Sequence, residues 1–429
     1  MKKFLVLLFI CSCIVPLQAQ SNYGLVFSSL KSDNLTLENA IRLGLENNSQ
    51  FLTAKEEITI AEQKLSEAKF RHLPQFALQG TASWYKADSP IILPDGGVSR
   101  LLPASNTLDG HTFYGVGATA TQYLYSGGRI SSTVKSARAN FKQAQSRYET
   151  VKNAVVLDIK TSFTRLLYAQ ENVKLTRHIA QQVARWHTSP DAWTHIRQKA
   201  LLAQLQAAYR QAQNELSQAR LAMLVSLNKE KNAPLTLSGT LEPVSVEGDL
   251  PHFELWATEF RPELKSAIYA LELDSIAIDL ALSKRYPDIL LNASYERVGD
   301  KDLDDENKQV SLAVRLPLPY TFSQQITQKK AEQKKSTLRR ASIEDDIHVQ
   351  VISSYEQMAF WQDEVQTRKK TFEALSSQVE RHLKTAPKTG VDGLEALQAY
   401  LQIGQSYLQA LRENHIAKAR LEWAIGKDL

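Results

Sequence analysis

The stretch LPQFALQGTASWY, Leu73 to Tyr85, alternates between two kinds of side chain, as a half-exposed β-strand does. One face carries the apolar residues Phe76, Leu78, Ala82 and Trp84. The other face carries Ala77, Gln79, Thr81, Ser83 and Tyr85. The sequence on both sides is rich in Ala and Gln and is typical of long helices. The fold must therefore accommodate a strand of membrane-spanning length inside a mostly helical chain.

The first residues, MKKFLVLLFICSCIVPLQAQ, have the pattern of a secretory signal peptide. Lys2 and Lys3 precede an apolar run, and small and polar residues follow it, so we expect residues 1–20 to be removed. Both cysteines, Cys11 and Cys13, lie in this segment, which excludes disulfides from the mature chain. The ICSC stretch resembles a lipoprotein cleavage box, which makes Cys13 a candidate for lipidation.

Charge gives no reason to expect a nucleic-acid partner. The formal net charge is +5, and removal of Lys2 and Lys3 leaves 49 basic against 46 acidic residues, or +3. Beyond the signal, no apolar run approaches the roughly 18–20 residues that a membrane-spanning helix needs. A membrane-embedded part would therefore have to consist of strands.

The chain contains the same pattern twice. The segment from Asn47 matches the segment from Phe260 without a gap, so that Pro74 and Pro287 correspond (287 − 74 = 213). In both copies a helix runs into a proline and then into an alternating strand. We predict a first repeat over 21–230, a linker over 231–259 and a second repeat over 260–429.

Each repeat is predicted to contain a helix, two strands and two further long helices. The strands are expected at about 73–85, 112–125, 287–298 and 309–319. The long helices are expected at 129–189, 191–228, 324–386 and 394–425. A Pro- and Gly-rich insertion, 86–111, is expected to form a long loop between the first two strands.

All four strands have one apolar and one polar face. The apolar faces add Tyr114, Val116, Ala118, Ala120 and Leu124; Ile289, Leu291, Ala293 and Tyr295; and Val310, Leu312, Val314, Leu316 and Leu318. The polar faces add Thr119, Thr121, Asn292, Ser294, Glu296, Ser311 and Arg315. An open four-stranded sheet would leave unpaired backbone groups in lipid, so other chains would have to complete a barrel. The pattern predicts an oligomer and does not by itself fix the number of copies.

Several segments resemble the TolC-like outer membrane efflux proteins. They include HLPQFALQGTASW from His72, YLYSGGRISSTVKSARA from Tyr123 and GVDGLEALQAYL from Gly390. The resemblance implies a mainly helical chain with membrane strands. It implies a homotrimer whose twelve-stranded β-barrel in outer-membrane lipid continues into a periplasmic tube of twelve helices. It also implies passive export of substrates received from an inner-membrane transporter through a periplasmic adaptor. The LPLP turn from Leu316 resembles the heavy-metal efflux branch.

The resemblance implies a gate of polar contacts near the periplasmic helix tips. We expect Glu171 at that tip in the first repeat, and Asp363 and Glu364 in the second. Three chains would gather these carboxylates near a narrow axis, where they would attract cations. Gly127 and Gly128 are expected to form the turn from strand to helix, because glycine tolerates positive φ. No catalytic motif, metal site or cofactor site is predicted.

Two alternatives remain open at this point. The same fold could serve as a conduit for type I protein secretion. In a different class, the chain could be a periplasmic structural coiled-coil protein whose strands form a soluble sheet.

Overall fold

The computed structural model describes residues 35–87, 92–95, 98–101, 108–184, 186, 192–233, 235–299, 303–317, 320–385 and 391–429. The predicted signal peptide and Cys13 lie outside the described residues. Gly390 also lies outside the described residues.

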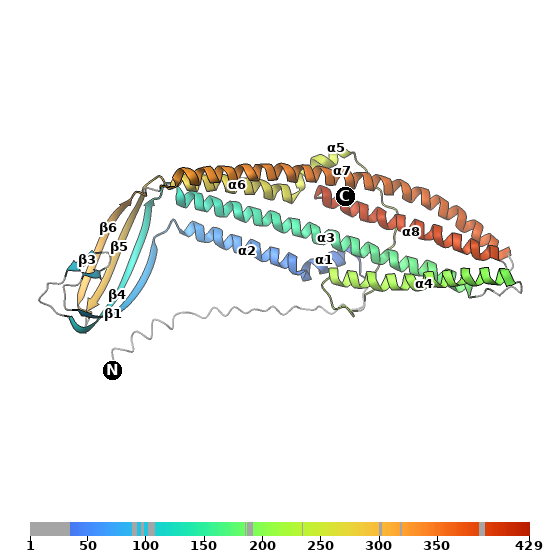
Figure 1. Ribbon diagram of the computed structural model, residues 1–429, viewed down its shortest axis with the longest axis horizontal. Helices are drawn as coiled ribbons and strands as arrows, with labels where there is room; N and C mark the ends of the chain where they lie inside the picture. The colour runs from blue at the N-terminus through green and yellow to red at the C-terminus, as the bar shows by residue number, and fades with distance from the viewer. Residues whose placement is uncertain are drawn as a thin grey trace.

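The molecule is elongated, with the β-strands at one end and long helices along the rest of its length (Figure 1). The first series of elements is α1 (Leu37–Asn47), α2 (Ser49–Phe70), β1 (Gln75–Ala87), β2 (Ile92–Asp95), β3 (Val98–Leu101), β4 (Leu108–Tyr125), α3 (Arg129–Val183) and α4 (Ala192–Ser226). The second series is α5 (Leu250–Phe260), α6 (Pro262–Ser283), β5 (Asp288–Gly299), β6 (Asp305–Arg315), α7 (Phe322–Thr385) and α8 (Val391–Ile425). Apart from the β2–β3 pair, the two series have the same order of elements.

The short helix that starts each series is separated from the next helix by one residue. Between α1 and α2 that residue is Asn48, whose side chain accepts a hydrogen bond from the Phe51 amide at 3.0 Å and so caps α2. Between α5 and α6 it is Arg261, which is followed by Pro262 at the first position of α6. Proline is suited to that position because its missing N–H would have no partner there.

The helices form a layer along the long axis (Figure 1). On the side of the sheet, α2 packs against α3, α3 against α6, and α6 against α7. Farther from the sheet, α3 packs against α4 and α8, and α8 also packs against α7. The helix α3 has 55 residues and α7 has 64, which gives lengths of roughly 80 and 95 Å at 1.5 Å per residue. These two helices therefore connect the sheet to the opposite end of the molecule.

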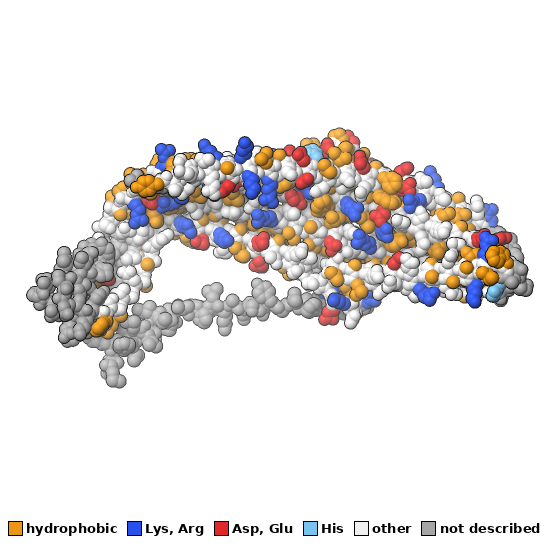
Figure 2. All heavy atoms as spheres, viewed as in Figure 1, with side chains coloured by type: hydrophobic (Ala, Val, Ile, Leu, Met, Phe, Trp, Pro, Cys, Tyr) orange, Lys and Arg blue, Asp and Glu red, His pale blue; other side chains and the backbone are white. Residues whose placement is uncertain are grey.

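Apolar clusters hold the middle of this layer together. One joins α1, α3 and the end of α4 around Ile159 and Leu227. Another joins α5, α7 and α8 around Phe253 and Val351. Charged side chains of both signs are spread over the visible face of the helical body (Figure 2). Among the described residues, no helix has the length and apolar character needed to cross a membrane.

The sheet has the order β1-β4-β5-β6, with every pair antiparallel. The register sets Phe76 opposite Ala120, Ala120 opposite Ala293, and Ala293 opposite Val310. Directly paired residues share a face of the sheet. The apolar residues predicted for the paired positions therefore lie on one side, and the polar residues lie on the other. Leu124 is the exception, because the register of β4 shifts between Tyr123 and Tyr125 and skips it.

Two details of the sheet differ from the sequence-based prediction. The segment expected as a long loop contains the short antiparallel pair β2–β3 and the first residues of β4. The last strand was expected at 309–319 but covers Asp305–Arg315. Pro317 cannot donate a ladder hydrogen bond, while Asp305 and Glu306 continue the pairing with β5. Leu316 therefore follows the strand, and Leu318 lies outside the described residues.

Candidate functional site

The apolar face of the sheet is uncovered in the isolated chain. Phe76 is 80% exposed, Leu78 is 83% exposed and Val310 is 77% exposed, although all three are in regular, paired strands. Trp84, Val116, Leu291 and Leu312 on the same face also count among the exposed large apolar residues. A continuous apolar face of this kind marks a surface that contacts lipid or another protein.

The opposite face of the sheet is polar, and its central charged residue is Glu296. Two glycines of β4 leave room for this side chain. A Cβ atom on Gly115 would lie 3.4 Å from the Glu296 Oε1 and 2.6 Å from the Thr81 Oγ1. A Cβ atom on Gly117 would lie 3.4 Å from the Glu296 Cβ. The glycines therefore allow the Glu296 side chain to lie close against β4.

The sheet joins the helices through a compact turn. Gly127 and Gly128 have φ values of 59° and 82°, in the left-handed region that favours glycine. The next residue, Arg129, begins α3, and its guanidinium lies 2.9 Å from the Asp288 carboxylate at the start of β5. This ion pair links the β4–α3 turn to the α6–β5 turn, so one strand-to-helix junction is tied to one helix-to-strand junction.

The two glycines of this turn should respond differently to substitution. A Cβ atom on Gly127 would lie 2.6 Å from the Tyr286 Cβ and 2.8 Å from the Ser283 carbonyl oxygen, whereas at Gly128 no atom lies within 4 Å. Gly128→Ala carries only the cost of positive φ, about 1–2 kcal/mol. We expect Gly127→Ala to lower the thermal unfolding midpoint clearly more, because its clash adds to that cost. Equal midpoints for the two variants would contradict this account.

The three carboxylates expected at the helix tips lie elsewhere. The helix α3 continues for 12 residues beyond Glu171 (183 − 171), and α7 continues for 21 residues beyond Glu364 (385 − 364). At 1.5 Å per residue these are roughly 18 and 32 Å. The expected tip position is therefore wrong, because sequence matching could not fix where each helix ends.

Two of these carboxylates form ion pairs with basic residues of their own helix. Glu171 forms an ion pair with Lys174 at 2.7 Å, and Glu364 forms one with Arg368 at 2.6 Å, each within one helix. Asp363 lines a cavity of about 310 Å³ beside Val246 and Gly248 of the segment between the two series. The structure of one chain does not bring Glu171 together with the other two.

The end of the molecule far from the sheet is held by apolar packing across the two series. Ile179 and Val183 of α3, Leu201 and Leu205 of α4, and Leu394 of α8 are buried in one cluster. The Trp186 ring lies against Gly393, where a Cβ atom would be 2.5 Å from the ring. Arg197 of α4 and Glu395 of α8 form an ion pair in the same region.

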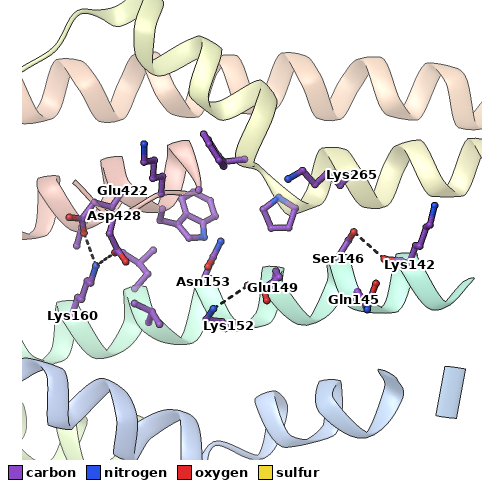
Figure 3. A pocket seen from close by; sticks show the side chains of 18 of the residues that line it. Lys142, Gln145, Ser146, Glu149, Lys152, Asn153, Lys160, Lys265, Glu422 and Asp428 are labelled. Carbon is purple, nitrogen blue, oxygen red and sulfur yellow. Dashed lines mark hydrogen bonds and ion pairs between the residues drawn. The ribbon is translucent and has the colours of Figure 1, made fainter. Parts of the chain in front are cut away.

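A groove of about 500 Å³ lies at the middle of the chain, beside α3 (Figure 3). We call it the α3 groove. One wall is α3, and the other consists of the start of α6, the end of α5, and the end of α8 with the residues that follow it. At its end Lys160 lies 2.7 Å from both Glu422 and Asp428. Burial acts to lower the pKa of Lys160, but hydrogen bonds to Asp428 and Glu422 outweigh it and raise the pKa.

Sequence reasoning missed this groove. Its lining residues run from Lys142 to Asp428, and no spacing within the chain indicates that they meet. In the part of the chain that the structure describes, no three His, Cys, Asp or Glu side chains are arranged to hold a metal ion.

Residues 40–187 match the family model described as outer membrane efflux protein. This segment contains the first of the two strand-to-helix junctions and the whole of α3. Over these residues the chain is similar to the outer membrane efflux proteins. No curated protein has a significantly similar sequence.

Solved structures share the fold of this chain. CusC is similar with a TM-score of 0.74 and 15% identity, covering 91% of this chain and 92% of CusC. The VceC outer membrane protein of Vibrio cholerae gives a TM-score of 0.73 and 13% identity, covering 91% and 96%. The CmeC outer membrane channel of Campylobacter jejuni gives 0.71 and 14%, covering 91% and 85%. At these identities the likeness establishes the fold of the chain alone.

Proposed function

We propose that this protein is the outer-membrane channel of a tripartite efflux system, and that three copies form the channel. The observation that carries the proposal is the sheet, which has an exposed apolar face, a polar face and two open edges, at β1 and β6. In lipid those edges would leave backbone groups unpaired at several kcal/mol each, so neighbouring copies must pair with them. Three copies would supply twelve strands, and rotational symmetry would close them into a barrel.

In this arrangement the apolar face contacts the outer membrane and the polar face lines a water-filled lumen. The long helices extend from the periplasmic rim of the barrel and form a tube. We infer that the two similar series of elements, 21–230 and 260–429 joined by 231–259, arose by duplication. Substrates would pass through the tube passively after delivery by an inner-membrane transporter and a periplasmic adaptor. Removal of a signal peptide over 1–20 fits this location, with or without lipidation of Cys13.

The exposed apolar face argues against a periplasmic structural protein with a soluble sheet. In such a protein the Phe76, Leu78 and Val310 side chains would be expected to pack under helices of the same chain, but they are exposed. The structure does not favour either protein secretion or heavy-metal export as the transported class, and both stay predictions from sequence.

Reconstitution tests the proposed function. Protein extracted in mild detergent should run as an oligomer of three chains, and it should give stable single-channel currents in planar bilayers. Glu171, Asp363 and Glu364 lie away from the ends of α3 and α7, but their part in a gate stays a separate prediction. In the same recordings, Ala substitutions of these three residues should change the conductance or the block by divalent cations if they form the gate. Unchanged currents in all three variants would remove the gate and leave the channel proposal intact. A monomer without channel activity would contradict the channel proposal itself.

A further inference from the structure

The α3 groove carries a surplus of positive charge. Five lysines line it: Lys142, Lys152, Lys160, Lys265 and Lys427. Three carboxylates line it: Glu149, Glu422 and Asp428. The balance is 5 − 3 = +2 within one groove. Gathering like charges is unfavourable unless counter-charges are close to them.

All three carboxylates already have lysine partners. Glu149 pairs with Lys152 at 3.2 Å. Glu422 and Asp428 both pair with Lys160, which has a side chain only 16% exposed. Among the described residues, no carboxylate forms an ion pair with Lys142, Lys265 or Lys427. The surplus charge therefore belongs to these three exposed side chains.

Aromatic rings accompany the same three ammonium groups. The Lys142 Nζ lies 5.5 Å from the centre of the Tyr269 ring, and the Lys265 Nζ lies 6.0 Å from that of Phe260. The Lys427 Nζ lies 4.0 Å from the centre of the Trp256 ring. A cation–π contact at an exposed site contributes only about 0.5–1 kcal/mol, and it leaves the ammonium N–H groups free to donate to an anion.

We propose that the α3 groove binds a small organic anion that carries at least two negative charges and a flat ring. Lys142 and Lys265 would approach it from α3 and α6 (Figure 3). Lys427 would approach it from the segment after α8. The Phe260, Tyr269 and Trp423 rings also line the groove and offer apolar contact to a ring. A volume of about 500 Å³ suits a ligand of this size, because small-molecule sites commonly span 300–1,000 Å³. This site is separate from the sheet and its two faces, so it does not depend on the channel proposal.

The test uses the full chain in a mild neutral detergent and pyranine, a fluorescent pyrene with three sulfonate groups, as the probe. Fluorescence anisotropy should show saturable binding that weakens as salt is added, because salt screens exposed charges. The triple variant Lys142→Gln, Lys265→Gln, Lys427→Gln should bind at least about tenfold more weakly, because it loses three charged hydrogen-bond donors to the anion.

The matched control is the triple variant Lys199→Gln, Lys334→Gln, Lys335→Gln. These lysines are exposed on α4 and α7 and lie outside the groove, and the net charge falls by the same amount. The control should bind within twofold of the unmodified chain. Circular dichroism melts of both variants verify that they are folded. Equal affinity in the groove variant, an equal loss in the control, or no saturable binding by the unmodified chain would overturn the site.

Discussion

Val310→Arg is expected to prevent most of the protein from assembling in the membrane. Val310 lies at the centre of β6 on the apolar face, opposite Ala293, and is 77% exposed in the isolated chain. In the proposed barrel this side chain meets lipid. An arginine near the bilayer midplane costs about 2–4 kcal/mol per chain in outer-membrane barrels, and three symmetric copies would each bear that cost. Gel electrophoresis of purified outer membranes measures the effect, as the amount of oligomer that is seen in unheated samples and lost on heating.

The neighbouring residue provides the matched control. Ser311 lies opposite Asn292 on the polar face of the same strand. In the proposed barrel, Ser311→Arg would place the same charge in the lumen, where water can solvate it, so assembly should be close to that of the unmodified protein. If the two arginine variants assemble equally well, the assignment of the two faces to lipid and water is wrong.

Arg261→Ala is expected to destabilise the helical body by about 3–5 kcal/mol, the range found when one partner of a buried ion pair is removed. The Arg261 side chain is only 3% exposed and lies 3.0 Å from the Glu263 carboxylate. It also donates hydrogen bonds to the Trp423 carbonyl oxygen at 3.0 Å and to the Gln350 Oε1 at 2.8 Å. Its guanidinium lies 4.4 Å from the centre of the Trp423 ring.

These contacts explain the large contribution expected of Arg261 to the stability of the helical body. Arg261 separates α5 from α6, and it donates hydrogen bonds to the Trp423 and Ala424 carbonyl groups in the last turn of α8. Carbonyl groups at the end of a helix lack their usual intrahelical partners, and the Trp423 carbonyl also accepts from the Gly426 N–H. It therefore fixes the point at which α8 ends and α6 begins. Arg261→Lys should recover only part of the stability, because a single ammonium cannot reproduce the planar set of donors.

Thermal unfolding of the purified oligomer, followed by circular dichroism, measures this effect. Arg339→Ala on the exposed surface of α7 is the control and should stay within about 0.5 kcal/mol of the unmodified protein. An unfolding midpoint for Arg261→Ala that matches the control would show that the junction between α8 and α6 is held by other contacts.

The sequence predicted the strands and their faces because alternation with period two is a local property. Phe76, Leu78 and Trp84 lie on one face in any regular strand, and the register of the sheet then places Val116, Leu291 and Leu312 beside them. The long helices were predictable for the same reason, since apolar spacing and the lack of Gly and Pro are visible in the chain. The start of α3 at Arg129 follows directly from the glycine pair.

The features that were missed depend on contacts between distant segments. The β2–β3 pair lies in a stretch whose Pro and Gly content indicated a loop. The two short strands pair with each other despite that composition. The tip position of Glu171 was wrong because a long amphipathic helix has no internal mark that shows where its neighbours turn. The α3 groove needs the meeting of α3, α6 and the end of α8, which only the packed structure shows.

Alternating residues of β6 are expected to face lipid and water in turn, and the proposed barrel requires this alternation. Because the only cysteines are Cys11 and Cys13, single cysteines can be introduced at positions 309–314 of a chain with both replaced, and can carry spin labels. Electron paramagnetic resonance in lipid bilayers then compares collisions with oxygen, which concentrates in lipid, and with a water-soluble nickel complex. Labels at 310, 312 and 314 should favour oxygen, and labels at 309, 311 and 313 should favour nickel. Equal access to the nickel complex at all six positions would contradict a barrel in the membrane.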